Sequence, residues 1–221
     1  MTAIFLALAI GSCMVWLELT RATPENIPEL RDGDVVLHTS GSGQSLAILM
    51  ATRSLYTHMG IVHITRHGPV IVEAASVVMQ TPLKDWIKRG RWGRLTILRK
   101  KELSPQKADE VVSHAASYVG RLYDPYFSMG TDRIYCSELV WLAFKEAGIK
   151  VGKIEKVGDL ALNSMPVKKV IEQRWKKYPA CHAQKIQNFP ECWEKILEGT
   201  IVTPASIADD TQFGSVYSNY F

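Results

Sequence analysis

Cys136 is the residue whose type and place in the sequence point most directly to chemistry. It stands within RIYCSELV (residues 133–140), at the first turn of a predicted helix. The dipole and the unpaired amides of a helix start favour an anion, so a thiol there tends towards the nucleophilic thiolate. The same amides can stabilise an oxyanion beside the sulfur, as acyl transfer requires. The alternative is that Cys136 is a small apolar residue buried by the helix.

His58 is the most suitable base for this thiol among the six histidines. It lies at the start of a predicted strand, THMGIV (57–62), and strand ends are where a rigid sheet presents side chains to a cleft. His63 has the opposite parity on the same strand and therefore faces the other way. His38 ends an earlier predicted strand beside a Gly/Ser loop and could also approach a site.

Glu73 supplies a third member of the arrangement. It lies in VIVEA (70–74), in a predicted hairpin whose turn is centred near Thr65 and Arg66. With this turn, residues whose numbers sum to about 131 face each other, which puts Glu73 opposite His58 or within two residues of it. A buried carboxylate needs a partner, and here it could fix the tautomer of the imidazole and stabilise the imidazolium. An ordinary cross-strand pair is the alternative.

The elements that position these residues are read from apolar spacing and turn residues. Strands are predicted at 35–38, 59–64, 70–74 and 94–99, and helices at 45–53, 83–88, 105–119, 133–147 and 167–178. Neither an internal repeat nor a low-complexity linker interrupts the chain. These elements indicate an α+β fold, with strands packed against helices, in a single domain over about 24–221.

Composition excludes several classes of protein. The 221 residues are 47% hydrophobic and 22% charged, which is ordinary for a globular domain with a sizeable core. Intrinsic disorder, collagen-like repeats and a multi-span membrane protein are excluded. Four cysteines are too few for a disulfide-rich mini-protein.

These residues resemble the permuted papain-like cysteine hydrolases of the NlpC-related superfamily, in particular the YaeF/YiiX-like group of bacterial envelope proteins. The elements that carry the resemblance, in chain order, are GDVV (33–36), QS (44–45) leading to YTHMGI (56–61), VEA (72–74), GRLYD (120–124), YCSELV (135–140) and TPAS (203–206). No single element is decisive, but the set in this order is specific and spans most of the chain.

The resemblance implies a circularly permuted papain-like fold with a Cys/His/polar triad in which the histidine strand precedes the cysteine helix. Carried over by position, Cys136 is the nucleophile, His58 the base and Glu73 the orienting residue. Tyr123 matches the tyrosine before the cysteine helix, where a role beside the oxyanion or the substrate is implied.

Two departures from the family pattern bear on the substrate. Tyr135 stands where unpermuted NlpC-type peptidases have an aspartate that reads a free amine of the stem peptide, and Glu138 replaces a glycine. Tyr135 therefore joins Tyr123 as a candidate beside the substrate, and stem-peptide specificity is not transferred. The substrate could be another amide or a lipid ester.

The first 22 residues are predicted to be a signal or anchor segment. Residues 3–17 are mostly apolar, but 15 residues fall short of the roughly 20 needed to span a bilayer. They match a secretory signal, with small residues at Thr20 and Ala22 for cleavage, although the segment has no basic residue before its apolar run. A lipid anchor on Cys13 and a buried helix are the alternatives. We expect export to the periplasm or cell envelope.

Cys181 and Cys192 are expected to pair in an oxidising compartment, since they lie in one polar segment and would close a short loop. A zinc site formed with His182 is the alternative, but it lacks a fourth ligand at usual spacing. No cofactor and no metal are predicted.

Charge indicates which partners to expect. The net charge of +4 is too small for a nucleic-acid-binding protein, so none is predicted. Eight basic residues fall within 84–101. They form either a solvated face or a contact surface for a membrane or a cell-wall polymer.

The sequence as a whole therefore predicts a thiol hydrolase of the bacterial envelope that cleaves an amide, of a peptide or of peptidoglycan, through an acyl-enzyme on Cys136. The alternatives are a lipid-directed thiol acyltransferase or esterase, and a non-catalytic binding module on the same fold.

Overall fold

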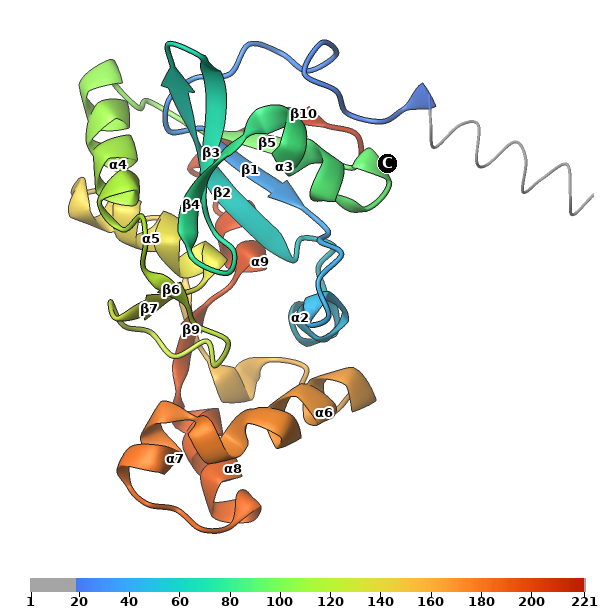
Figure 1. The fold of residues 1–221 in the computed structure, drawn as a ribbon, viewed down its shortest axis with the longest axis vertical. Helices are drawn as coiled ribbons and strands as arrows, with labels where there is room; N and C mark the ends of the chain where they lie inside the picture. The colour runs from blue at the N-terminus through green and yellow to red at the C-terminus, as the bar shows by residue number, and fades with distance from the viewer. Residues whose placement is uncertain (1–18, 221) are drawn as a thin grey trace, which may run out of the picture.

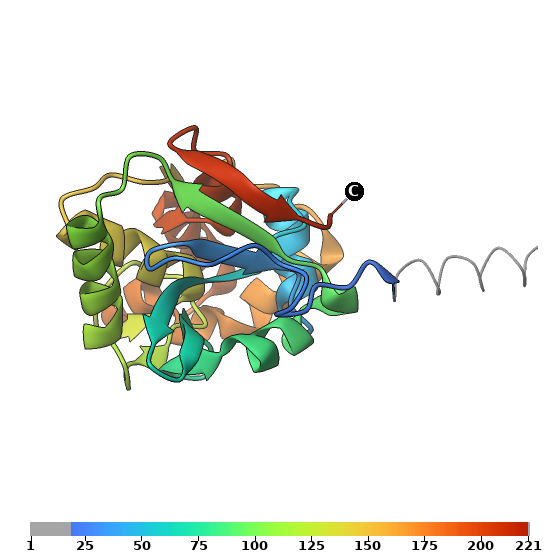
Figure 2. The same cartoon turned by 90° about the horizontal axis from the view of Figure 1, so that it is seen from above.

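The computed structural model describes residues 19–220. It contains a six-stranded antiparallel sheet with helices on both faces and a further group of helices at one end (Figure 1). The strand order is β10-β5-β1-β2-β3-β4, and Figure 2 shows β10 beside β5 at the edge. The strands are β1 (Val35–His38), β2 (His58–Thr65), β3 (Gly68–Ala74), β4 (Val78–Pro82), β5 (Thr96–Lys100) and β10 (Phe213–Ser218). The α+β prediction is confirmed, although β4 and β10 were not predicted from the sequence.

Alternation along the strands gives the sheet two apolar faces. On one face, Met59 and Val72 pack against α4 (Pro105–Ser117) and α5 (Cys136–Glu146). On the other face, Val62 packs in a second cluster with Trp86 of α3 (Leu83–Arg89) and with the segment before β1. Because both faces are covered, the ends of the strands are where a ligand can reach the sheet.

A helical appendage, α6–α8 (165–198), follows α5 and lies beyond the end of the sheet (Figure 1). Its helices are α6 (Met165–Arg174), α7 (Pro179–Ala183) and α8 (Phe189–Glu198). The short strands β8 (Ile154–Lys156) and β9 (Thr200–Val202) pair antiparallel where the chain enters and leaves it, and α9 (Pro204–Ala208) follows. The appendage touches the main body through α2 (Ser45–Thr52), which packs against α6.

The disulfide expected between Cys181 and Cys192 is present and joins α7 to α8. The alternative zinc site on these cysteines is therefore not formed. The predicted third helix, 167–178, is shorter than expected, because α6 ends at Arg174 and a 3₁₀ turn, Trp175–Lys177, follows it.

The hairpin of β2 and β3 differs in register from the sequence prediction. Ile61 pairs with Val72 and Thr65 with Gly68, so the paired numbers sum to 133 rather than 131. The turn is centred one residue later than predicted, at Arg66 and His67. An even shift keeps every side chain on its predicted face, and Glu73 consequently lies diagonally from His58 on the same face.

Gly60 stands where this register would otherwise put a side chain against Glu73. A Cβ at Gly60 would lie 2.5 Å from Ile71 Cγ2, 2.8 Å from the Val72 carbonyl oxygen and 3.2 Å from Glu73 Cβ. The missing side chain leaves the space in which Glu73 reaches across to His58.

The residues before β1 contact the domain. The predicted leader is 1–22, of which 1–18, with Cys13, lie outside the described residues. Ala22 is buried and donates its N–H to the Gly93 carbonyl at 2.8 Å, while the Thr20 carbonyl accepts from Asn219 Nδ2 at 2.7 Å. Within 19–220, no helix has the length and apolar character to cross a membrane.

Replacing Gly60 with alanine tests the packing around Glu73. We expect Gly60→Ala to destabilise the fold by about 1–3 kcal/mol, the usual cost of overpacking, because Ile71 and the backbone of Val72 cannot easily retreat. Gly43→Ala is the matched control, since a Cβ there meets nothing within 4 Å. Thermal melting measures both, and equal melting temperatures in the two variants would contradict the packing argument.

Candidate active site

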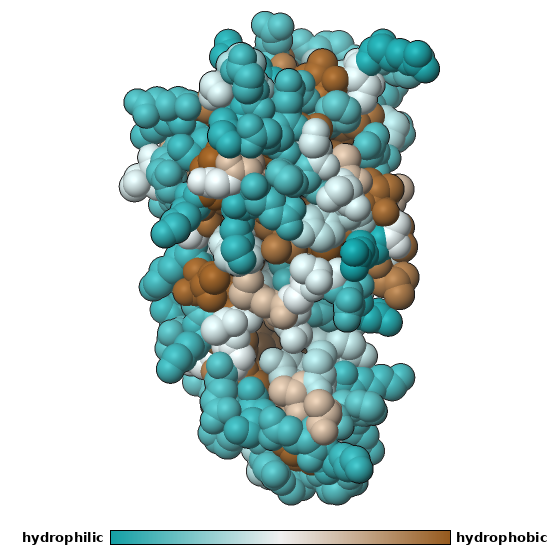
Figure 3. Space-filling model, turned by 90° about the vertical axis from the view of Figure 1, so that its left-hand side faces the viewer, coloured by the Kyte–Doolittle hydropathy of each residue, from teal (hydrophilic) through white to brown (hydrophobic). Residues whose placement is uncertain are grey.

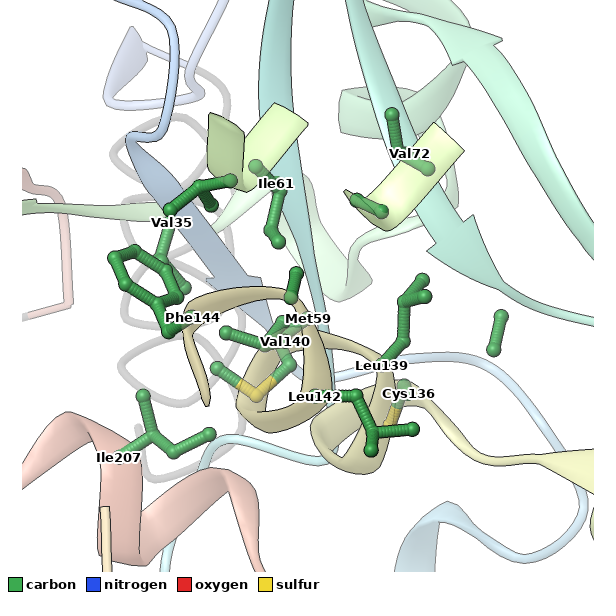
Figure 4. Packing of buried hydrophobic residues seen from close by; sticks show 14 of the residues in the cluster. Val35, Met59, Ile61, Val72, Cys136, Leu139, Val140, Leu142, Phe144 and Ile207 are labelled. Atoms are coloured by element: carbon green, nitrogen blue, oxygen red, sulfur yellow. The ribbon is translucent and has the colours of Figure 1, made fainter. Parts of the chain in front are cut away.

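Cys136 is the first residue of α5 and is 2% exposed. Figure 4 shows it at the start of the helix beside Leu139 and Leu142, which belong to the same apolar cluster. It is the free cysteine of the described chain. Its position at the helix start is the one predicted, and its burial leaves only a narrow approach to the sulfur.

His58, the candidate base, approaches this thiol from the opposite face of the sheet. By strand alternation, His58 and Glu73 share the face of α3, whereas α5 covers the opposite face. Because His58 is the first residue of β2, its ring can reach towards Cys136 at the end of the sheet, close enough for the two groups to influence each other electrostatically. His58 Nε2 lies 2.6 Å from Glu73 Oε2, so Nδ1 is the nitrogen left for the thiol.

The pKa of His58 rises to about 9, and the imidazolium is its dominant form at neutral pH. Burial by itself would lower this pKa, but the hydrogen bonds and negative charges of Cys136 and Glu73 outweigh it. A protonated ring beside the thiol carries a proton that it can give to a leaving group, as a cysteine hydrolase requires.

Glu73 has no solvent exposure and is held by three side chains. Oε2 bonds to His58, while Oε1 accepts from Thr81 Oγ1 at 2.5 Å and from the Arg89 guanidinium. Although burial would raise the pKa of Glu73, the hydrogen bond and charge of His58, the Thr81 bond and the charge of Arg89 together hold this pKa below its usual value. Glu73 is therefore held as a carboxylate in contact with the imidazolium.

Thr81 and Arg89 were not identified as site residues from the sequence. Thr81 lies on β4, which apolar alternation did not reveal, and Arg89 is the last residue of α3. Arg89 did stand out as part of the basic run 84–101, but its pairing with a residue 16 positions earlier depends on how α3 crosses the sheet.

His38, the second histidine that the sequence placed near a site, does lie beside His58. Their residues are paired across β1 and β2, with ring centroids 5.4 Å apart, and His38 stacks on Trp86 at 4.0 Å. Burial, and then the positive charges of His58 and Arg89, hold the pKa of His38 well below its usual value. A neutral ring that stacks on Trp86 and lies tilted beside His58 fills this side of the imidazolium without adding a second positive charge.

Tyr123 and Tyr135 have different surroundings. The Tyr123 hydroxyl accepts a hydrogen bond from Gln44 Nε2 at 2.7 Å, and its phenol lies close enough to Cys136 to interact with the charge of the thiolate. The Tyr135 hydroxyl instead accepts from the Val202 N–H at 3.1 Å, which ties the start of α5 to β9. Tyr123 lines a pocket with His58, whereas the Tyr135 hydroxyl is engaged by the backbone of β9.

Glu138, the other departure from the family pattern, points inwards. Its carboxyl accepts from the Gly130 N–H at 2.6 Å and from the Tyr135 N–H at 3.4 Å, fixing the loop before α5. Burial, with some help from the charge of Asp124, raises the pKa of Glu138 to about 8 despite these bonds. This residue is therefore a largely neutral anchor of the helix start, and it offers no anion to a substrate ammonium.

An apolar cavity of about 110 Å³ adjoins Cys136 on the side away from His58's polar partners. It lies between α2, the start of α5 and the helical appendage. Its lining includes Ala47, Ala51, Leu162, Val170 and Ile171. In the space-filling view of Figure 3, the surface is mainly hydrophilic, with a hollow between the main body and the appendage.

Known proteins resemble this chain along most of its length. A family model described as permuted papain-like amidase enzyme, YaeF/YiiX, C92 family, matches residues 29–217. The uncharacterized protein YiiX of Escherichia coli (strain K12) is 33% identical over 202 residues, covering 90% of this chain and 92% of YiiX. A crystal structure described as that of the metalloprotein YiiX from Escherichia coli O157:H7 superposes with a TM-score of 0.74 at 33% identity, covering 85% of this chain and 97% of that one.

The metal in that description does not fit the residues found here. Among residues 19–220, no group of three or more His, Cys, Asp or Glu side chains could hold a metal ion. Both oxygens of Glu73 already bind His58, Thr81 and Arg89, two of them cationic, which disfavours a metal cation beside it.

The match over most of the chain, together with a cysteine at a helix start and a Glu-oriented histidine, confirms the resemblance found in the sequence. The chain belongs to the permuted papain-like amidase family of YaeF and YiiX, and is a cysteine hydrolase of that class.

Proposed function

We propose that this hydrolase cleaves an amide bond of a peptide or of peptidoglycan through a thioester on Cys136. The observation that carries the proposal is the imidazole of His58, held between the thiol and the buried Glu73 carboxylate. This order of charges suits a poor leaving group such as an amine, because the proton needed for its departure is already on the ring.

The reaction follows from these positions. The Cys136 thiolate attacks the carbonyl carbon, and the C=O electron pair moves onto the oxygen beside the amides at the start of α5. As the C–N bond breaks, His58 gives its proton to the departing nitrogen. Neutral His58 then takes a proton from water as its oxygen attacks the thioester carbon, and breaking of the C–S bond releases a carboxylic acid and the Cys136 thiolate, which restores the starting ion pair with the His58 imidazolium.

A lipid-directed acyltransferase or esterase is the second candidate, and the apolar cavity favours it. The cavity reaches Cys136 itself, so the acyl part of a thioester could lie among Ala51, Val170 and Ile171. The same cavity would accept an apolar side chain of a peptide. The dependence on acyl length separates these two substrates.

Location in the cell envelope and contact with a membrane surface are part of the proposal. The disulfide is consistent with an oxidising compartment. The basic run 84–101 contains two kinds of residue. Arg94 is buried and Arg99 pairs with Asp34 at 2.7 Å, whereas Lys84, Lys88 and Arg91 are exposed.

Trp92 follows Arg91 and is 61% exposed. The Gly93 carbonyl after it accepts a hydrogen bond from the Ala22 N–H, at the end of the predicted leader. An exposed tryptophan beside lysines suits a lipid interface next to an anchor.

Alkylation of Cys136 tests the triad without a known substrate. At pH about 6.5, where a free thiol is almost fully protonated, we expect wild-type Cys136 to react rapidly with iodoacetamide. His58→Ala should slow this reaction by on the order of 10²-fold, and Glu73→Gln by less, since it removes only the orienting charge. Labelling at Cys136 is followed by mass spectrometry, with Cys136→Ser as the blank. Equal rates in wild type and His58→Ala would contradict the assignment of His58 as the base for Cys136.

Filling the cavity tests the second candidate. If an acyl chain enters it, p-nitrophenyl octanoate should acylate Cys136 faster than the acetate ester, and Ala51→Trp should abolish that difference while sparing the acetate rate. Ile48→Trp, on the same helix and cavity wall, is a second variant in case the first fails to fold. Nitrophenolate release gives both rates. An acylation rate that does not depend on the length of the acyl chain would contradict a lipid-directed function.

Vesicle binding tests the surface contact. The chain from residue 19 onward should sediment with vesicles containing phosphatidylglycerol and not with pure phosphatidylcholine, and the triple variant Lys84→Gln, Lys88→Gln, Arg91→Gln should lose this binding. Each basic residue near an anionic surface contributes about 1 kcal/mol. Binding that is insensitive to the triple change would refute a role for these residues.

A further inference from the structure

Arg174 connects the helical appendage to the active site. It is the last residue of α6, and its Nη1 donates to Gln44 Oε1 at 3.0 Å and to the Pro125 carbonyl at 2.6 Å. Gln44 immediately precedes α2, and Pro125 lies two residues after Tyr123. One half-buried guanidinium thus holds Gln44, which lines the cavity at Cys136, and the backbone two residues after Tyr123, which lines a pocket with His58.

This contact decides which way the Gln44 amide faces. A guanidinium has only donors, so the amide must present its oxygen to Arg174. Its Nε2 then faces Tyr123 and donates to the phenol oxygen at 2.7 Å. Without the guanidinium, the amide could rotate by half a turn and present its oxygen to Tyr123 instead.

The direction of this bond determines what Tyr123 can do. Because its oxygen accepts from Gln44, its own hydrogen is free to be donated elsewhere. Burial, and then the negative charge at Cys136, raise the pKa of Tyr123 well above its usual value, so the phenol keeps that hydrogen throughout the working range. If the amide were reversed, the Gln44 oxygen would accept this hydrogen and remove it from the site.

We propose that Arg174 is a positioning residue for acyl transfer, which fixes the Gln44 amide so that Tyr123 donates its hydroxyl hydrogen to the acyl oxygen at Cys136. No proton is transferred in this step: as sulfur attacks, the C=O electron pair moves to oxygen, and the Tyr123 O–H stabilises the charge that forms there. The inference rests on the proposed thioester on Cys136, and it adds that formation of this thioester requires the helical appendage.

The rates of two reactions at Cys136 distinguish a positioning role of Arg174 from a merely structural one. Acylation by p-nitrophenyl acetate develops negative charge on the acyl oxygen, whereas alkylation by iodoacetamide requires only the thiolate. A loss of the oxyanion donor should lower the first rate and leave the second unchanged. Loosening of the appendage or damage to the thiolate–imidazolium pair would lower both.

We expect Arg174→Met to slow acylation of Cys136 by about 10- to 100-fold, within the range measured for loss of a donor to a developing charge. Tyr123→Phe should cause a similar loss. The double variant should be no slower than Tyr123→Phe, because both changes remove the same hydrogen bond. Arg174→Lys, which still presents only donors, should retain most of the rate. Lys169→Met, an exposed change on the same helix, is the matched control.

Gln44→Glu gives the sharpest contrast. A carboxylate would keep or strengthen the link to Arg174, so a structural role for that link predicts an unchanged or more stable protein with full activity. A carboxylate can only accept, however, and would take the Tyr123 hydrogen. The proposal therefore predicts that Gln44→Glu loses acylation like Tyr123→Phe while its melting temperature is preserved.

The outcomes distinguish the inference from the function on which it rests. Normal acylation in Arg174→Met or in Gln44→Glu, or additive losses in the double variant, would overturn the inference and leave the hydrolase intact. Parallel losses of acylation and alkylation would also overturn it. Wild-type protein that releases no more nitrophenolate than Cys136→Ser would overturn the proposed function and the inference together.

Discussion

Glu73 is a carboxylate with no exposure to solvent, and the active site is organised around keeping it charged. Removing such a group from water costs several kcal/mol, so the charge persists only because three donors surround it. Each donor comes from a different element: His58 from the start of β2, Thr81 from β4 and Arg89 from the end of α3. The sheet and the helix that covers it must therefore be folded before the imidazole has its orienting partner.

The charges of the site alternate as a consequence. Arg89 and the His58 imidazolium flank Glu73, and Cys136 lies on the far side of the ring. The two positive groups offset the carboxylate, which allows Glu73 to stay fully buried, while the Arg89 side chain at the outer end of the series is 43% exposed. The stacked His38 stays neutral and does not disturb this balance.

Cys136 lies at the boundary between two chemical environments. On one side are the polar partners of His58, at the end of the sheet, and on the other is an apolar cavity completed by the helical appendage. A substrate that places its scissile carbonyl at the sulfur would extend into both. The appendage is thus part of the site: it supplies one wall of the cavity and, through Arg174, a fixed orientation for the Gln44 amide.

Local sequence patterns were enough for the fold class, for a helix with Cys136 in its first turn and for the proximity of His58 and Glu73, because strand alternation and helix starts depend on near neighbours. The hairpin turn was predicted one residue early, yet the parity of the pairing, and hence the face shared by His58 and Glu73, was right. Thr81, Arg89, Gln44 and Arg174 were missed as site residues. Gln44 belonged to a segment that carried the family resemblance and Arg89 to the basic run 84–101, but neither pattern reveals their partners. These contacts depend on elements that meet only in the folded chain: Arg174 reaches a residue 130 positions away. Sequence alone therefore determined which groups could do the chemistry, and tertiary structure decided which charges and hydrogen bonds hold those groups in the forms that they need.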